Sequence, residues 1–307
     1  MTATLCFAQK PVHHDPQAGT NPKTVTAYQI KPITVDGDFS DWPNTLEKRS
    51  CEEFYPAYAI NTSELSTQDN WFSVAWNDQT NEIYIAAYSE DDVNASQLSQ
   101  WNGGVISGDA WFCERWEVYV EWDNDKAGTY GPIGDGNVQY VIVQNDKGRT
   151  DGNYAISQEK DAAGNILDDG AAFWMYKYET IMPDGRPPFA KAKWVLKPKD
   201  PNNPFGPYVG QLEISFKVLN YLLEGVEPNE STDVVDLGPN VNDGRGIGFD
   251  MTFMDRDGDI KTMVTSMDWA WIGWSSESKV NQVQFDGNLL FSTTFKESTR
   301  IANWDIY

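Results

Sequence analysis

The chain has 307 residues, with 46 Asp and Glu against 23 Lys and Arg and a formal net charge of −23 at pH 7. Nucleic acids and anionic membrane surfaces bind patches of Lys and Arg, so this charge argues against both kinds of partner. The histidines, His13 and His14, lie in a polar N-terminal segment outside the expected domain, which excludes from that domain a histidine-containing catalytic triad, a His/Cys zinc site and a His-ligated haem.

The three cysteines are too few for a Cys₄ metal site. Cys51 and Cys113 form a disulfide if the protein is exported, or else remain two unpaired thiols, and the sequence leaves both alternatives open. Residues 1–8 end in Cys6-Phe-Ala8, which is typical of the tail of a secretory signal. We therefore expect a secreted, periplasmic or cell-surface protein. No stretch is long and apolar enough for membrane insertion.

The first part of the chain predicts β structure with turns. Residues 9–28 lack hydrophobic periodicity and predict a flexible lead-in, and residues 33–35 predict a short strand before an Asp-Gly turn. Apolar residues recur at every second position in residues 71–76 and in residues 83–88, which predicts two strands joined as a hairpin through the loop at 77–82.

Between residues 109 and 125 the alternation is clearest. One face of the expected strand is apolar and predicts a core: Trp116, Val118, Val120 and Trp122. The other face sets two carboxylates around a phenol and predicts a solvated ligand surface: Glu117, Tyr119 and Glu121.

The second half of the chain contains further predicted strands, at 138–144, 211–216 and 247–254. The segment at about 145–208 is rich in aromatic residues, Gly, Asp and Pro and predicts a long insertion, whose part at 186–208 we expect to be an ordered surface loop. Residues 217–223 form the only plausible helix.

Short strands separated by turns, with almost no helix and no βαβ pattern, predict an all-β fold, an antiparallel β-sandwich of jelly-roll or immunoglobulin-like type. We expect a signal remnant and flexible lead-in at 1–29, one domain at 30–295 that includes the insertion, and a C-terminal tail at 296–307. Of the 13 Trp, 14 Tyr and 14 Phe, most are expected to fill the core, which leaves several tryptophans as exposed platforms.

The order of these segments resembles the family 9 carbohydrate-binding modules, relatives of the DOMON-type sandwiches. Five motifs in the family's order carry the resemblance: the opening Ile33, Val35, Asp36, Gly37, Asp41 and Trp42, the hairpin 74–91, the strand 114–120, the strand 247–255 and the closing 285–289.

The resemblance implies a saccharide held between two tryptophans while a strand carboxylate binds its hydroxyl groups. By position, Trp111 matches the first tryptophan and Glu117 the carboxylate, and Trp274, or else Trp271, matches the second tryptophan. Two further residues complete the candidate ligand-binding set: Glu114 and Gln139. The chain departs from the family where a basic residue is replaced by Val141, and where the insertion is longer than usual.

The resemblance also implies structural Ca²⁺, because the family usually binds it and Asp91 resembles one ligand, with Asp92 adjacent. Asp36 and Asp41 are further oxygen donors, although as turn formers they need no metal. Calcium as a cofactor is therefore an open expectation.

The expected function is non-catalytic binding of an oligo- or polysaccharide, by tryptophan stacking and carboxylate hydrogen bonds. A glycan-cleaving enzyme is the first alternative, but it needs two carboxylates about 5–10 Å apart. Glu117 and Glu121, on one strand face, are about 13 Å apart at about 3.3 Å per residue. The second alternative is a cell-surface interaction domain that has lost the sugar site.

Overall fold

The computed structural model describes residues 13–20, 22–54, 69–94, 114–128, 130, 137–144, 157–158, 162–165, 171–175, 187–203, 206–221, 226–239, 244, 246–257, 268–275, 284 and 286–298. Nearly all regular structure in these ranges is β, which confirms the all-β prediction. The strands are β1 Thr24–Gln29, β2 Arg49–Ser50, β3 Glu53–Phe54, β4 Trp71–Asn77, β5 Glu82–Asp91, β6 Arg115–Glu121, β7 Val138–Gln144, β8 Ser157–Gln158, β9 Ala171–Met175, β10 Ala190–Pro198, β11 Tyr208–Phe216, β12 Ile247–Asp257, β13 Asp268–Gly273 and β14 Gly287–Phe295.

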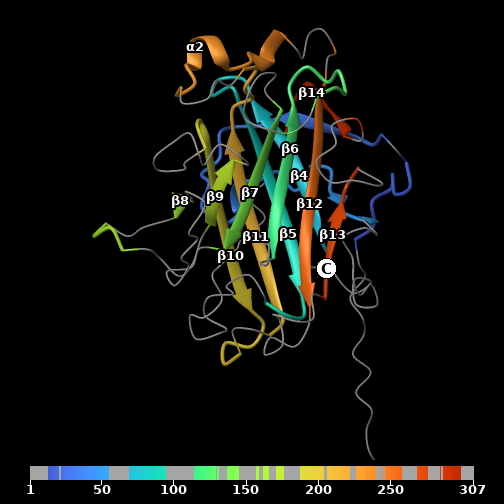
Figure 1. The fold of residues 1–307 in the computed structure, drawn as a ribbon, viewed down its shortest axis with the longest axis vertical. Coiled ribbons are helices and arrows are strands. Elements are labelled where there is room, and N and C mark those ends of the chain that lie inside the picture. Colours follow the sequence, from blue (N-terminus) through green and yellow to red (C-terminus); the bar gives the residue numbers. More distant parts are fainter. Residues whose placement is uncertain are drawn as a thin grey trace, which may run out of the picture.

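One mixed sheet carries the fold, and eleven of its strands follow one another in the order β10-β11-β5-β4-β1-β14-β12-β6-β7-β9-β8, while β2, β3 and β13 pair off this path. The sheet curls into a nearly closed, barrel-like sandwich, because β10 at one end lies against β9 and β7 near the other (Figure 1). All its pairings are antiparallel except those of β1, which runs parallel to β14 and β4. Two short helical elements lie wholly within the described ranges, a 3₁₀ turn at Phe39–Asp41 and α2 at Glu230–Asp233.

The main core lies inside the curled sheet, where the apolar faces of β6 and β12 meet those of β4, β5, β7 and β11. Trp116, Val118 and Val120 of β6 are buried there, and Trp116 packs on Phe253 of β12 with ring centroids 4.9 Å apart. Trp122 is partly buried against the same core. The alternation in the sequence thus predicted both strands and their core faces correctly.

A second, smaller core lies outside the sheet, beneath the loop of residues 30–46. Glu213 of β11 is buried there and accepts three hydrogen bonds, from the amides of Asp36 and Gly37 at 2.7 Å each and from the Trp42 indole at 2.6 Å. Gly37 has φ +80°, which only glycine adopts readily. The predicted strand at 33–35 is wrong, because this loop bonds to the Glu213 side chain instead of pairing with a strand.

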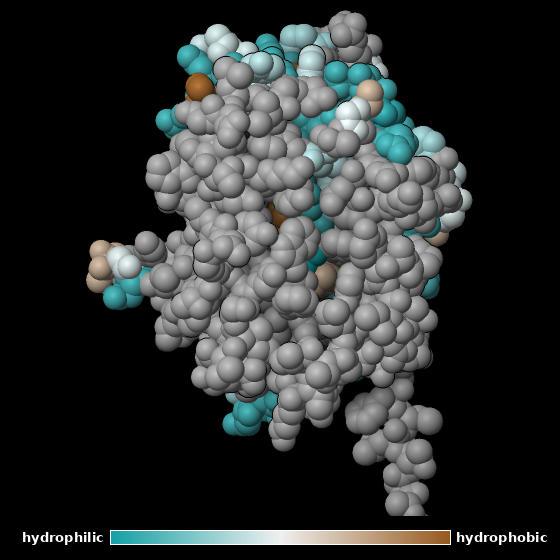
Figure 2. All heavy atoms as spheres, in the orientation of Figure 1, coloured by the Kyte–Doolittle hydropathy of each residue, from teal (hydrophilic) through white to brown (hydrophobic). Residues whose placement is uncertain are grey.

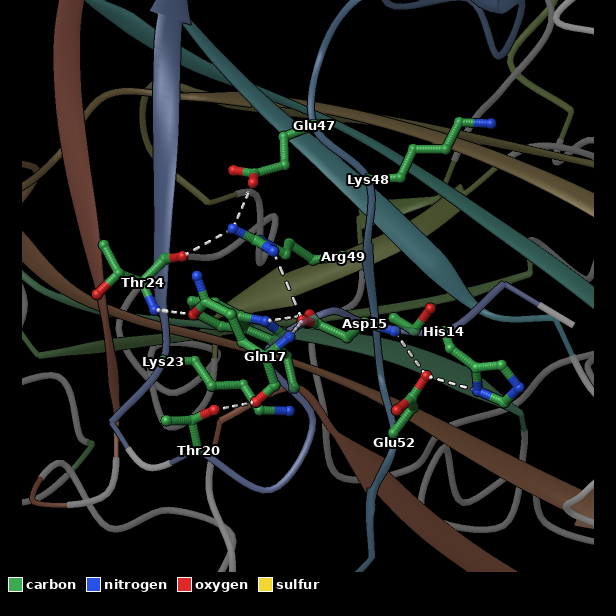
Figure 3. Close-up of polar contacts among 12 residues, drawn as sticks. His14, Asp15, Gln17, Thr20, Lys23, Thr24, Glu47, Lys48, Arg49 and Glu52 are labelled. Carbon is green, nitrogen blue, oxygen red and sulfur yellow. Dashed lines mark hydrogen bonds and ion pairs between the residues drawn. The ribbon is translucent and has the colours of Figure 1, made fainter.

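The N-terminal segment belongs to the folded structure, so the predicted flexible lead-in is wrong over its described part. Residues 24–29 form β1, in the middle of the sheet. Before β1, Asp15 accepts a hydrogen bond from the Trp274 indole at 2.9 Å and lies 3.5 Å from the guanidinium of buried Arg49 (Figure 3). The ammonium group of buried Lys23 pairs with Glu53 at 2.9 Å. In these contacts each buried charge lies beside a charge of opposite sign, which offsets the free-energy cost of removing it from water.

Two other predictions are also wrong. The expected surface loop at 186–208 contains the nine-residue strand β10, which is held by antiparallel pairing to β11 and by burial of Trp194. In the described part of the expected helix at 217–223, Leu219 forms a β-bridge with Val234, and α2 follows further on. Figure 2 shows hydrophilic side chains gathered around α2 at the upper end of the molecule.

Cys51 is a buried free thiol whose sulfur donates to the Met251 carbonyl at 3.5 Å. Of the two alternatives for this cysteine, the structure has the unpaired one. Burial, more than any other effect, raises the pKa of the Cys51 thiol, which favours the neutral form. Among the described helices, none has the length and apolar character needed to cross a membrane.

Candidate functional site

The candidate site is the face of β6 that points away from the main core, together with the matching faces of β7 and β12. Two cross-strand rows follow from the register. In the first, Glu117 lies between Val141 of β7 and Thr252 of β12. In the second, Tyr119 lies between Gln139 of β7 and Asp250 of β12. Side chains directly opposite each other in antiparallel strands point to the same side, so these residues share one face.

Glu117 is the centre of a buried hydrogen-bond network. Its carboxylate accepts from the Arg115 guanidinium, from the Tyr119 hydroxyl and, at 3.1 Å, from the Gln139 amide. The Gln139 amide also lies 3.3 Å from the Tyr119 hydroxyl, and Arg115 reaches the Met254 sulfur at 2.8 Å. The face is therefore polar as predicted, but it is not solvated: Glu117 is 0% exposed. Burial is tolerated because Arg115 neutralises the carboxylate and hydroxyl and amide donors surround it.

Two polar atoms beside Glu117 make no hydrogen bond within the described part of the chain: the Gln139 side-chain oxygen and the Thr252 hydroxyl. Both residues are almost fully buried. The amide orientation of Gln139 is fixed, because only its nitrogen can donate to the Glu117 carboxylate. The unused oxygen is therefore a true acceptor, and a buried acceptor without a partner has a cost of about 1–3 kcal/mol.

The second row continues into a group of acids. The pairing of β12 with β14 ends at Phe249 and Gly287, and Asp250 and Asp286 are the next residues beyond that last pair. The Asp250 carboxylate accepts the amide of Ser275 at 2.9 Å, and the Tyr130 hydroxyl donates to Asp286. Burial and the nearby Asp250 carboxylate raise the pKa of Asp286 well above its ordinary value.

Glu121 closes this end of the face. Burial raises its pKa to about 7, although the ammonium and amide groups of Lys126 act in the opposite direction. Its side chain lies over Gly248, where an added Cβ would approach the Glu121 Cβ to 2.8 Å. The ring of Tyr130 packs on Tyr119 at 5.0 Å and so lies over the second row.

A separate acidic cluster lies where the main core ends, between the two sides of the curled sheet. Asp91 of β5, Glu114 just before β6 and Asp255 of β12 are all buried, and their carboxylate oxygens lie within 4.8 Å of one another. Tyr208 of β11 donates to Glu114 at 3.0 Å. Three carboxylates are the hard oxygen donors that Ca²⁺ prefers. A second group, at the end of β6, is mostly exposed: Glu121, Asp123 and Asp125.

The predicted calcium ligands divide into two sets. Asp91 is in the buried cluster, whereas Asp92 is exposed beside it. Asp36 and Asp41 carry turn hydrogen bonds, from the amides of Asp38 at 2.9 Å and Thr34 at 3.0 Å, and belong to neither acidic group of the described residues. Glu114, predicted as a ligand for sugar, lies on the core side of β6 with the acidic cluster and not beside Glu117.

The predicted tryptophans are not assembled into a platform. Trp274 is fully buried, with its ring 5.6 Å from Phe72 and 6.1 Å from Phe249 and its indole N–H bonded to Asp15. Trp274 completes the main core, so neither face of its ring is open to a sugar. The prediction that Trp274 is the second stacking tryptophan therefore needs correction. Trp271 pairs with Met254 in the strand ladder, and its side chain lies outside what the structure describes, as does all of Trp111.

Glu117 and Gln139 are thus the predicted ligand residues that the structure brings together. Sequence reasoning missed Thr252, Asp250 and Asp286. Thr252 and Asp250 alternate with the apolar residues of β12, so the sequence could have shown that they share the polar face of that strand. Which residues of β6 lie opposite them follows only from the register of the two strands.

No protein-family model matches the sequence, and no curated protein matches it significantly. The fold is similar to a crystal structure described as that of "a putative carbohydrate-binding protein" from Bacteroides uniformis, with a TM-score of 0.38 and 11% sequence identity. The match covers 88% of this chain and 99% of the other. Likeness at this level does not by itself assign a function.

Proposed function

We propose that this protein is a non-catalytic carbohydrate-binding protein whose site is the polar face of β6, β7 and β12. The observation that carries the proposal is the buried Glu117 network beside two unused polar atoms, the Gln139 oxygen and the Thr252 hydroxyl. Sugar hydroxyl groups both donate and accept, so they fit a surface that mixes a carboxylate, a phenol, an amide and an alcohol.

The arrangement favours binding over glycan cleavage. Glu117 already accepts hydrogen bonds from the Arg115 guanidinium, the Tyr119 hydroxyl and the Gln139 amide, so its carboxylate is engaged within the protein and not aimed at a glycosidic bond. Glu121 is four residues further along the same strand face, about 13 Å away, which is too far for a pair of catalytic carboxylates. The stacking ring that a saccharide needs is assigned to Trp111 by sequence alone. An extracytoplasmic location belongs to the same proposal.

Calorimetric titration of the full chain with a panel of mono- and disaccharides tests the proposed function. We expect dissociation constants between about 1 μM and 1 mM. Glu117→Gln should weaken binding about tenfold or more, because hydrogen bonds to a charged group contribute about 1.5–3 kcal/mol. Glu227→Gln, at an exposed site, is the matched control and should bind like the unmodified protein. A panel that gives no heat with any saccharide would refute the proposal, as would unchanged binding by Glu117→Gln.

We also propose structural Ca²⁺ at the cluster of Asp91, Glu114 and Asp255, where it would join the two sides of the curled sheet at the end of the core. The three converging carboxylates would supply this cation with hard oxygen ligands. Ca²⁺ at 100 times its dissociation constant should stabilise the fold by about 2.7 kcal/mol, seen as a rise in melting temperature over chelator. Asp255→Asn should abolish the rise and Asp92→Asn should keep it. Equal melting temperatures with Ca²⁺ and chelator would contradict the site.

A further inference from the structure

The described residues before β1, which are 13–20, 22 and 23, form an N-terminal strap that docks on the sheet through charges and hydrogen bonds (Figure 3). Asp15 is buried against Arg49 and the Trp274 indole, and the ammonium group of buried Lys23 lies 2.9 Å from a carboxylate. No residue of the N-terminal strap belongs to either hydrophobic core. A segment that buries little apolar surface opens at a lower free energy than the core does, so the strap can be released while the sheet stays folded.

The last residue of the strap is connected with the second row of the candidate site. The Lys23 amide donates to the Ser275 hydroxyl at 3.3 Å, and the Ser275 amide donates to the Asp250 carboxylate at 2.9 Å. Asp250 lies opposite Tyr119 of β6, and the Tyr119 hydroxyl donates to Glu117. The connection therefore ends at the centre of the buried hydrogen-bond network.

A second connection runs from Lys23 to β14. The Asn288 amide donates to the Lys23 carbonyl at 2.8 Å. A Cβ added to Gly287 would lie 2.9 Å from that carbonyl oxygen and 2.6 Å from the Trp274 ring, so the strap and Trp274 both pack closely on this glycine. Asp286, the acid at the end of the second row, immediately precedes Gly287. The docked strap thus supports the backbone beside both acids of the row.

We infer that the N-terminal strap positions the second row of the candidate site, with Asp15 as its anchor and Lys23 as the residue that connects it with Asp250 and Asp286. The inference rests on the proposed function, because the property that the strap controls is the affinity for the saccharide. A coupling of this kind changes affinity by about fivefold or more.

Release of the strap acts on the row through lost hydrogen bonds. The Ser275 hydroxyl loses the Lys23 amide, and the Asn288 amide loses the Lys23 carbonyl. A buried polar group that has lost its partner is costly, so fully buried Ser275 shifts to regain one. Because the Ser275 amide is bonded to the Asp250 carboxylate, that shift changes the row opposite Tyr119.

Hydrogen exchange of the Ser275 amide and titration with the saccharide that binds the unmodified protein best, both on the full chain, test the inference. Asp15→Ala removes the acceptor of the Trp274 indole and the partner of Arg49, so it should release the strap. At a temperature where circular dichroism shows the variant to be folded, the Ser275 amide should exchange faster and the affinity should fall about fivefold or more.

Glu213→Ala is the matched control for Asp15→Ala. Glu213 is also a buried carboxylate that accepts an indole N–H, from Trp42, but it lies beneath the loop of residues 30–46 and has no contact with the strap among the described hydrogen bonds. Its replacement should change neither the exchange of the Ser275 amide nor the affinity. If Asp15→Ala does not fold, Asp15→Asn carries the same comparison, because its amide oxygen still accepts from the indole while its charge is lost.

The outcomes separate the inference from the proposed function. Unchanged affinity in a folded Asp15→Ala variant would overturn the inference and leave saccharide binding intact. An unchanged exchange rate of the Ser275 amide would also overturn it, since the strap would then not act on the row. Equal losses of affinity in Asp15→Ala and Glu213→Ala would point to general destabilisation and overturn it too. An unmodified protein that binds no saccharide would overturn both the inference and the proposed function.

Discussion

Replacing Glu213 with Gln should remove part of the pH dependence of the protein's stability. Glu213 is fully buried beneath the loop of residues 30–46, and burial raises its pKa from 4.5 to about 7 although two amides and the Trp42 indole donate to it. The folded state thus binds a proton at Glu213 more tightly than the unfolded chain does. This contribution to stability is complete below about pH 4.5 and is lost as the pH rises through about 7.

The magnitude follows from the two pKa values. One pKa unit corresponds to about 1.4 kcal/mol, so the difference between 4.5 and about 7 contributes at most about 3 kcal/mol. Urea unfolding followed by tryptophan fluorescence at about pH 4.5, 6, 7 and 8 measures the change. The unmodified protein should lose stability across this range, and Glu213→Gln should lose about 3 kcal/mol less.

Glu121 titrates in the same window, so Glu213→Gln should keep a smaller residual slope. Glu227→Gln, at an exposed residue, serves as the control and should leave the pH profile unchanged. If Glu213→Gln showed the same pH slope as the unmodified protein, the reasoning about this buried carboxyl group would be wrong.

Three further predictions concern packing and the site. Trp274→Ala should lower the free energy of unfolding in urea by about 3–5 kcal/mol, because it leaves a cavity beside Phe72 and Phe249. A variant that stayed stable and lost only saccharide binding would instead support a ligand role for Trp274. Gly248→Ala should cost about 1–3 kcal/mol, since its Cβ would press on Glu121, and a neutral result would disprove that close contact. Tyr130→Phe removes the hydrogen bond to Asp286, so it should destabilise the fold by about 1–3 kcal/mol while leaving the ring against Tyr119; an unchanged unfolding midpoint would contradict the bond.

The sequence predicted those parts of the fold that local alternation controls. β4, β5, β6, β7 and β12 were found with nearly correct bounds, because in each of them apolar side chains that face the main core recur at every second position. β1 and β10 were missed for different reasons. β1 is a short polar strand whose place depends on parallel partners far away in the chain, and β10 lies in a Pro-rich stretch whose pairing with β11 overrides local composition.

The site was predicted in part. The face that carries Glu117 was found, but its burial was not, because alternation distinguishes two faces without saying what covers the polar one. Gln139 and Glu117 were both in the expected ligand-binding set, and the structure joins them by a hydrogen bond, whereas the places of Thr252 and Asp286 follow only from the pairing of β12 with β6 and β14. Trp274 was assigned to the ligand but is buried in the core. The sequence alone cannot make this distinction, because a tryptophan that packs in a core and one that stacks on a sugar look the same in the sequence.

A crystal structure of the protein with the tightest-binding saccharide tests the central claim most directly. The proposal predicts a sugar on the face of β6, β7 and β12, with hydroxyl groups within hydrogen-bond distance of the Gln139 oxygen and the Thr252 hydroxyl and with the Glu117 network beneath it. A saccharide bound elsewhere, with these groups unchanged, would contradict the proposed site.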